Sequence, residues 1–244
     1  MDTQRQQIEE YYKDKLDESY QGDFYQPRYH KFIELLMNKK NARILDIGCG
    51  AGDFLLILKD QGFSKVEGLD YSRQAKNFAE KRGLKVTLCD IEKDKLPYRN
   101  KFDVVILGDI LEHTFEPAFF LRKVKKLLEK DGWLLISVPN AGWYLNGILL
   151  TFFPQFLRLS PAFGVWTHCN QFTFYTLKKI LQDSGFEVIR LIGIPFVQPK
   201  PPKESIIRKI LKFIFRLPIK FTDLFSNFYP PVFSSHLIVL AIRE

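Results

Sequence analysis

The sequence has few cysteines, no long apolar run and no hydrophobic leader, and each absence excludes a class of protein. Cys49, Cys89 and Cys169 are far apart and form no CxxC pair, which argues against a disulfide framework and a cysteine-paired metal site. Met1–Glu18 is polar and charged, unlike a secretory signal. No stretch reaches the roughly 18 consecutive apolar residues of a membrane-spanning helix. We therefore expect a cytoplasmic protein. Peripheral attachment to the inner face of the membrane is compatible with this expectation.

Length and composition indicate one α/β domain with elaborations. The chain has 244 residues, 46% of them apolar, which is enough for a sizeable core and too many for a disordered protein. Its formal net charge is +8. Such a charge fits a nucleic acid, an anionic membrane surface or simply a basic enzyme.

Short β-branched or apolar runs alternate with stretches of helical periodicity, a pattern typical of a parallel, doubly wound sheet. Strands are expected at 43–47, 65–69, 85–88, 102–107, 133–138, 187–191 and 236–242. Helices are expected at 8–16, 29–37, 54–61, 73–82, 117–128 and 176–184. Gly62, Gly83, Gly132 and Gly185 stand where four of these helices should end.

A glycine-rich turn, DIGCGAG, links the first expected strand to the next helix. Gly48, Gly50 and Gly52 allow a tight turn and remove the Cβ atoms that would keep a ligand away from the backbone. The free amides at the following helix start favour a polar or anionic group, and Asp46 can accept hydrogen bonds from an ammonium group. The GxGxG spacing differs from the GxGxxG of dinucleotide-binding folds, which argues against NAD.

Two further carboxylates follow the second and third strands. Asp70 offers two oxygens to the two hydroxyls of a ribose. Asp90 is placed to accept from an adenine amino group, with Ile91 packing on the ring. A glycine-rich turn alone is often an ordinary strand-to-helix turn, but three successive strand ends carrying DxGxG, Asp and Asp favour a nucleoside-containing ligand.

These residues resemble the class I S-adenosylmethionine-dependent methyltransferases, most clearly over 42–138 and more loosely over 167–191. The resemblance implies a Rossmann-like α/β fold: a seven-stranded doubly wound sheet with its last strand antiparallel and helices on both faces, formed by residues 1–244 as a single domain. It implies that the glycines hold the methionine part of S-adenosylmethionine, Asp70 the ribose, and Asp90 with Ile91 the adenine. The expected cofactor-binding set is Asp46, Gly48, Cys49, Gly50, Gly52, Asp70, Tyr71, Asp90, Ile91, Gly108 and Asp109.

A finer resemblance points to the type 11/type 23 group. It is carried by FDVVILGDILEH at 102–113, DGWLLISVPN at 131–140 and THCNQF at 167–172. Ubiquinone-biosynthesis O-methyltransferases have a similar layout. This group acts on many substrates, so the resemblance indicates the type of reaction, methyl transfer, more closely than it indicates the acceptor molecule.

Histidines are the natural candidates for a base that removes a proton from a hydroxyl acceptor. His113 follows the fourth strand and His168 follows the first insertion, so both can approach the methyl position; each can instead merely fix its loop. His30 and His236 fall in a helix and a strand and are expected to be structural.

Asp109, Glu112 and His113 form a D-x-x-E-H cluster. In some methyltransferases a similar set binds a divalent cation, and oxygen ligands with one imidazole suit Mg²⁺ or Mn²⁺. This chain has Asp109 where that pattern has Glu, and metal-free relatives share the cluster. We therefore expect no metal, with these three residues as the weak candidates for one.

Two insertions, at 141–166 and 193–235, interrupt the alternation of strands and helices. Residues 1–40 are expected to form a helical cap. The first insertion is hydrophobic; the second contains KESIIRKILKFIFRLPIK at 203–220, an amphipathic pattern with six basic side chains. Both should emerge at the ligand edge of the sheet.

The insertions favour a hydrophobic or lipid-linked acceptor methylated, at oxygen, on an anionic membrane surface. Two alternatives remain: a lid over a soluble small molecule or glycan, and a dimer interface. A non-catalytic nucleoside- or RNA-binding member of the fold is a third, although nucleic acid is disfavoured because the basic residues alternate with aliphatic rather than stacking aromatic ones.

Overall fold

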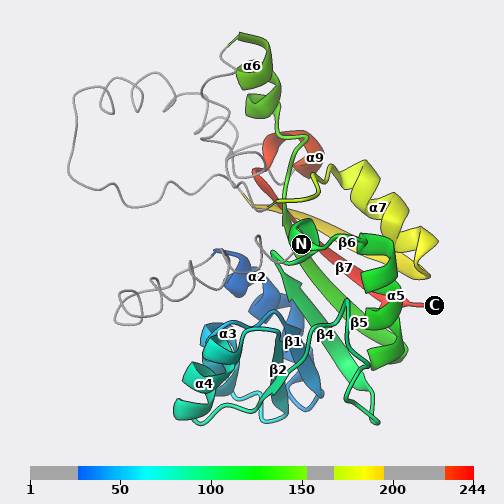
Figure 1. Ribbon diagram of the computed structural model, residues 1–244. Helices are drawn as coiled ribbons and strands as arrows, with labels where there is room; N and C mark the ends of the chain where they lie inside the picture. Colours follow the sequence, from blue (N-terminus) through cyan, green and yellow to red (C-terminus); the bar gives the residue numbers. More distant parts are fainter. Residues whose placement is uncertain (1–26, 153–167, 195–228) are drawn as a thin grey trace.

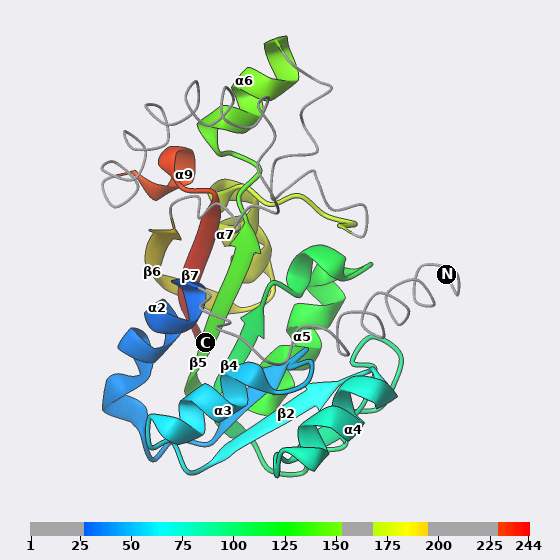
Figure 2. The same cartoon turned by 90° about the vertical axis from the view of Figure 1, so that its left-hand side faces the viewer.

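The computed structural model describes residues 27–152, 168–194 and 229–244. In these ranges one twisted sheet carries helices on both faces (Figure 1, Figure 2). The expected helices at 8–16 and 203–220 lie outside the described residues, as do most of the two insertions. The expected Rossmann-like α/β architecture is confirmed by the sheet.

The sheet has seven strands in the order β3-β2-β1-β4-β5-β7-β6. The strands are β1 (Ile44–Ile47), β2 (Val66–Asp70), β3 (Val86–Leu88), β4 (Phe102–Gly108), β5 (Leu128–Pro139), β6 (Phe186–Ile194) and β7 (His236–Arg243). β7 pairs antiparallel with both β5 and β6, whereas the pairs from β3 to β5 are parallel. All seven expected strands and the antiparallel last strand are present.

Helices α2, α3 and α4 contribute to the core on one face of the sheet, and α5 and α7 to the core on the other. The helices are α2 (Pro27–Leu36), α3 (Asp53–Asp60), α4 (Arg73–Lys81), α5 (Pro117–Leu127), α6 (Tyr144–Phe152), α7 (Phe174–Asp183) and α9 (Pro230–Phe233), with 3₁₀ turns η1 (Met37–Lys39) and η2 (Leu111–His113). None of the helices in the described ranges is long and apolar enough to cross a membrane.

Alternation along β1 decides which face carries the site. Leu45 and Ile47 pack in the core beneath α5 and α7, whereas Ile44 packs in the core beneath α2 and α3. Because side chains alternate along a strand, Asp46 shares the face of Ile44. The carboxylate of Asp46 therefore points toward α2 and α3.

The transition from α5 to β5 differs from the expectation. The helix ends at Leu127 and the strand starts at Leu128, five residues before the expected start at 133. Leu128 pairs with Phe102 of β4 and its carbonyl accepts a hydrogen bond from the Arg243 side chain, so tertiary pairing extends the strand. Gly132 is not the left-handed residue there; Asp131 is, with φ 59°.

Asn140 fixes the chain where β5 leaves the sheet toward α6. Its side chain is 1% exposed. Nδ2 donates to the carbonyl oxygens of Pro231 at 3.0 Å and Ser234 at 2.7 Å, and Oδ1 accepts from the amide of Gly142 at 2.9 Å. One amide side chain thereby ties the start of the first insertion to the end of the second.

Replacing Asn140 by Asp should destabilise the protein by about 2–4 kcal/mol, because a carboxylate oxygen replaces the donor facing two buried carbonyl oxygens. Urea unfolding measures the loss, and the deficit should shrink at low pH, where a protonated carboxyl regains one donor. The same change at exposed Asn100 is the matched control. Equal stability of Asn140→Asp and Asn100→Asp would contradict this role.

Candidate active site

The glycine-rich turn leaves β1 with three left-handed glycines. Gly48, Gly50 and Gly52 have φ of 72°, 54° and 85°. A Cβ on Gly52 would come within 2.2 Å of Leu84 Cδ1, whereas a Cβ on Gly50 would meet nothing within 4 Å. Gly52 is therefore required by packing as well as by backbone conformation, and Gly50 leaves open space beside the turn.

Asp70, at the end of β2, holds this turn in place. Its Oδ2 accepts from the amide of Gly50 and its Oδ1 from the amide of Ser72, both at 2.8 Å. Burial raises the pKa of Asp70, and these hydrogen bonds oppose the rise. The expected ribose contact of Asp70 stays a prediction, since each oxygen retains acceptor capacity beyond the one amide it binds.

Asp46 lies in the wall of a cavity beneath α2. The cavity encloses about 30 Å³. Its lining also includes three of the expected site residues, Gly48, Cys49 and Gly108. Burial, together with the nearby charge of Asp70, raises the pKa of Asp46 to about 7, although Arg28 opposes the rise. Asp46 is thus poised between its neutral and ionised forms near neutral pH.

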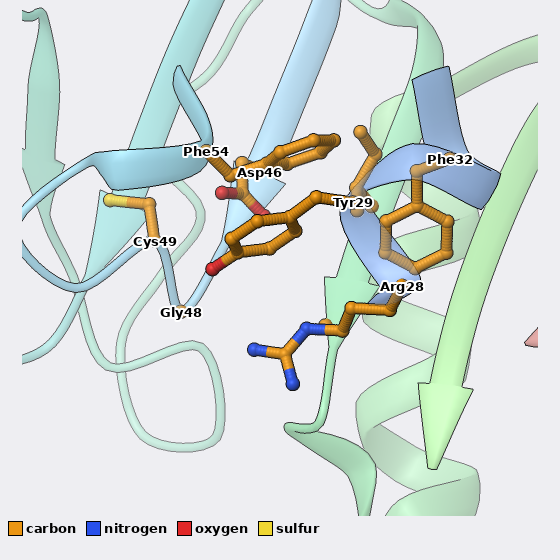
Figure 3. Close-up of a pocket in the computed structure, with 9 residues that line it drawn as sticks. Arg28, Tyr29, Phe32, Asp46, Gly48, Cys49 and Phe54 are labelled. Carbon is orange, nitrogen blue, oxygen red and sulfur yellow. The ribbon is translucent and has the colours of Figure 1, made fainter. Parts of the chain in front are cut away.

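Three side chains of α2, those of Arg28, Tyr29 and Phe32, line this cavity (Figure 3). The Tyr29 ring stacks on the Phe54 ring, with 4.5 Å between the two centroids. The Cζ atom of Arg28 lies 5.1 Å from the centroid of the Tyr29 ring. The sequence predicted a helix here, but none of its residues was assigned to the cofactor site. A signal was present, because Arg28, Phe32 and Leu36 recur every four residues and so share the inward face of the helix.

Asp109 anchors Arg28 at the end of β4. Its Oδ2 forms an ion pair with the guanidinium, and its Oδ1 accepts from Ser137 Oγ at 2.6 Å. Burial alone would raise the pKa of Asp109, but Arg28, His236 and Ser137 hold it below its usual value. Asp109 is therefore ionised, and its charge attaches α2 to the sheet.

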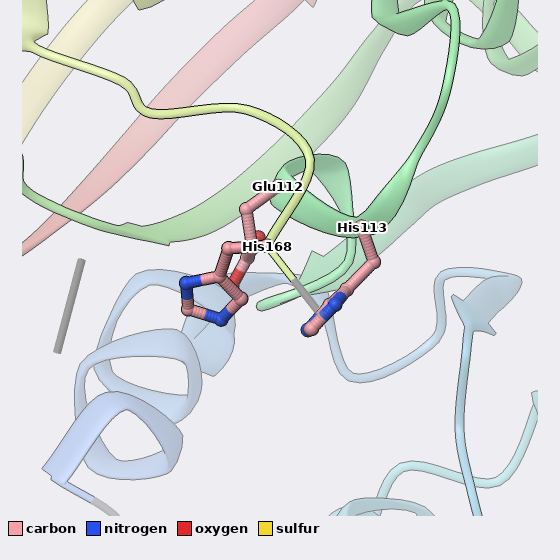
Figure 4. Close-up of side chains that lie close together, drawn as sticks. All are labelled: Glu112, His113 and His168. Carbon is pink, nitrogen blue, oxygen red and sulfur yellow. The ribbon is translucent and has the colours of Figure 1, made fainter. Parts of the chain in front are cut away.

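Glu112, His113 and His168 lie close together, as Figure 4 shows. Their possible ligand atoms lie within 4.8 Å of one another, and the two imidazole rings are 4.7 Å apart. The Glu112 carbonyl accepts from the amides of Cys169 and Asn170 at 2.8 and 3.0 Å. These bonds bring His168 to His113, and the catalytic roles expected of the two histidines stay predictions.

The Glu112 side chain is 1% exposed, and burial together with the charge of Asp109 raises its pKa well above the usual range. Among the described residues, the group that could hold a metal is Glu112 with both histidines. Asp109, a weak candidate by sequence, instead faces Arg28 and Ser137.

The adenine-side residues follow β3. The Oδ1 atom of Asp90 accepts from the amide of Glu92 at 3.1 Å, and Ile91 is 5% exposed. Tyr71, directly after β2, is half-buried. All the expected contact positions thus lie at the carboxyl ends of β1 to β4 or just beyond, where open α/β sheets bind ligands.

Replacing Asp46 by Asn should stabilise the protein at neutral and higher pH. A carboxyl with a raised pKa binds its proton more tightly in the folded state, so the free energy of unfolding falls as the pH rises from about 4 to about 7. The asparagine variant loses this fall and should be more stable by ~2–4 kcal/mol at about pH 8. If Asp46 accepts from the ammonium group of S-adenosylmethionine, as the sequence predicts, the variant should also bind that ligand more weakly.

Urea unfolding across that pH range and calorimetric titration with the ligand measure the two effects. Asp60→Asn, the same change at an exposed aspartate of α3, is the control. Identical pH dependence of stability in wild type and Asp46→Asn would contradict the raised pKa of Asp46.

Residues 19–191 match a family described as a methyltransferase domain. Over 160 residues the chain is 29% identical to a ubiquinone biosynthesis O-methyltransferase of Bradyrhizobium diazoefficiens, covering 63% of this chain and 62% of that protein. A Pelagibacter ubique protein of the same name is 36% identical over 105 residues, 41% of this chain and 43% of that protein. The chain thus spans about half the length of these relatives. An uncharacterised protein of Methanocaldococcus jannaschii is 29% identical over 226 residues, 84% of this chain and 86% of that protein.

Solved structures share the fold at low identity. A methyltransferase from Archaeoglobus fulgidus aligns with TM-score 0.58 and 22% identity, covering 93% of this chain and 98% of that one. Magnesium protoporphyrin IX methyltransferase from Synechocystis, with bound S-adenosylmethionine, aligns with TM-score 0.61 and 16% identity, covering 99% and 97%. The sheet order, the glycine-rich turn and the family match agree, and the chain therefore belongs to the methyltransferase-domain family, as a class I S-adenosylmethionine-dependent methyltransferase.

Proposed function

We propose that this methyltransferase acts on a hydroxyl oxygen of a hydrophobic or lipid-linked acceptor. The observation that carries the proposal is the pair of imidazoles of His113 and His168, 4.7 Å apart beside the buried Glu112. Transfer to oxygen requires removal of the hydroxyl proton, and imidazole is the side chain suited to this near neutral pH. We assign the base to this pair.

The donor is held by the residues around the cavity beneath α2 and along the strand ends. Arg28 has donors beyond those used on Asp109, so it can pair with the carboxylate of the methionine part while Asp46 accepts from its ammonium group. Asp70 is assigned to the ribose, and Asp90 with Ile91 to the adenine. The sulfonium methyl supplies the electrophile, and these side chains bind and align it.

The first insertion supports a hydrophobic acceptor. Helix α6 projects from the sheet above the carboxyl end of β5, near α9 (Figure 1, Figure 2). Three of its apolar side chains are exposed: Ile148 by 39%, Leu150 by 51% and Phe152 by 68%. Exposed apolar side chains grouped on one short helix are costly in water and favour contact with lipid or with a hydrophobic substrate.

The names of the relatives support the same acceptor chemistry. Several are ubiquinone biosynthesis O-methyltransferases, at 28–36% identity. Ubiquinone precursors combine a phenolic hydroxyl with an apolar tail. A phenol carrying a polyprenyl tail is therefore the first acceptor class to test.

Replacing His113 and His168 together by Gln should lower kcat with a prenylated catechol by at least about a hundredfold, since general-base assistance is typically worth that much. The assay follows methyl transfer from labelled S-adenosylmethionine, and S-adenosylhomocysteine binding should stay unchanged. His30→Gln, at an exposed position of α2, is the control. Wild-type kcat in the double variant would rule out the base assignment.

Replacing Leu150 and Phe152 by Ser should reduce sedimentation with vesicles that contain phosphatidylglycerol, since it removes two strongly exposed apolar side chains of α6. The sequence further predicts that binding falls with added salt and with Glu at Arg208, Lys209 and Lys212, which lie outside the described residues. Ile189→Ser, at a position 50% exposed on β6, is the matched control. A wild type that ignores anionic vesicles at low salt would refute the membrane part and leave the methyl transfer untouched.

A further inference from the structure

The loop that follows β3 is held by a side chain of α5. Lys123, in the middle of α5, donates from Nζ to the carbonyl oxygens of Ile91 at 2.8 Å, Glu92 at 3.3 Å and Asp94 at 2.9 Å. An ammonium group has three donors and no acceptor. Lys123 therefore uses its full donor capacity on one short loop.

A side chain of the loop in turn binds the segment that leads into α5. Glu92 Oε1 accepts from the amides of Phe115 at 2.9 Å and Glu116 at 3.3 Å. These amides lie at the start of an 11-residue helix whose own N-cap side chain makes no capping hydrogen bond. A carboxylate there satisfies amides that lack intrahelical partners and interacts favourably with the helix dipole.

The position of these contacts gives them a functional consequence. The loop carries Asp90 and Ile91, and its internal bonds run through the same residues, with the Asp90 amide donating to Asp94 Oδ2 at 2.8 Å. The segment at Phe115 and Glu116 directly follows His113 and the η2 turn. The adenine-side loop and the segment after His113 are thus joined twice. Lys123 of α5 binds the loop through its ammonium group, and Glu92 of the loop binds the segment through its carboxylate.

We propose that Lys123 and Glu92 are positioning residues: Lys123 fixes the adenine-side loop for cofactor binding, and Glu92 couples that loop to the segment bearing His113. The proposal rests on the proposed assignment of Asp90 and Ile91 to the adenine. A purely structural role would require only that the two residues stabilise the fold. The coupling predicts more, namely that ligand affinity and loop protection change in protein that remains folded.

The first test measures adenosine and S-adenosylhomocysteine affinity by calorimetry for Lys123→Met, Lys123→Arg and Lys126→Met. Lys123→Met should weaken both ligands roughly tenfold, because the loop loses a charged donor to three carbonyls. Lys123→Arg should recover most of the affinity. Lys126→Met removes an equal charge from an exposed position on the same helix and should bind like wild type.

Wild-type affinity for adenosine in folded Lys123→Met would overturn the proposal. Asp90→Ala separates this failure from a failure of the adenine assignment. If Asp90→Ala also binds adenosine normally, the assignment itself is wrong; if it alone binds weakly, the role of Lys123 is wrong.

The second test follows hydrogen exchange with adenosine as the ligand. In wild type, adenosine should slow exchange both in the loop at 89–95 and in the segment at 111–117. Glu92→Gln retains an acceptor oxygen and should behave like wild type, whereas Glu92→Ala should keep the loop protection and lose that of 111–117. Equal protection of 111–117 in wild type and Glu92→Ala would show that the two segments are not coupled through Glu92.

Discussion

Buried negative charge at one edge of the sheet must be compensated, and the arrangement of the site follows from how each carboxylate meets that requirement. Asp109 is compensated by the guanidinium of Arg28 and the hydroxyl of Ser137. Asp70 is compensated in part by backbone amides of the turns that it shapes, although burial still raises its pKa. For Asp46 burial prevails, and its pKa rises to about 7. A ligand that brings an ammonium group to Asp46 would restore its charged form, so binding and electrostatic compensation are the same event.

These compensating contacts also position the elements around the site. The ion pair with Asp109 attaches α2 to the end of β4, which places Tyr29 against Phe54 and closes the cavity from above. The same elements therefore form both the fold and the site to which we assign the methyl donor. The stability cost of keeping Asp46 in the cavity wall is consistent with the common conflict between stability and function at binding sites.

The region to which we assign the acceptor is assembled differently, from loops joined by hydrogen bonds rather than from strands joined in a sheet. The carbonyl of Glu112 draws the segment with His168 toward His113, and Asn140 ties the beginning of α6 to the turn before β7. Functional side chains on loops positioned by a rigid sheet are a general arrangement in enzymes. Here it lets two segments about 55 residues apart along the chain present their imidazoles together.

The sequence alone predicted the strands of the sheet and the glycine-rich turn, because apolar runs and the spacing of glycines are local properties of neighbouring residues. Its resemblance to the class I methyltransferases implied the class of methyl donor. Its limits appear at particular residues. Leu128 begins a strand because β4 and Arg243 hold it there, and Arg28 enters the cavity because Asp109 lies opposite. Only the tertiary structure decided that Asp70 binds Gly50, that Asp109 faces Arg28 rather than Glu112, and that His168 meets His113. Such partners depend on which groups folding brings together and buries, and spacing along the chain does not encode that.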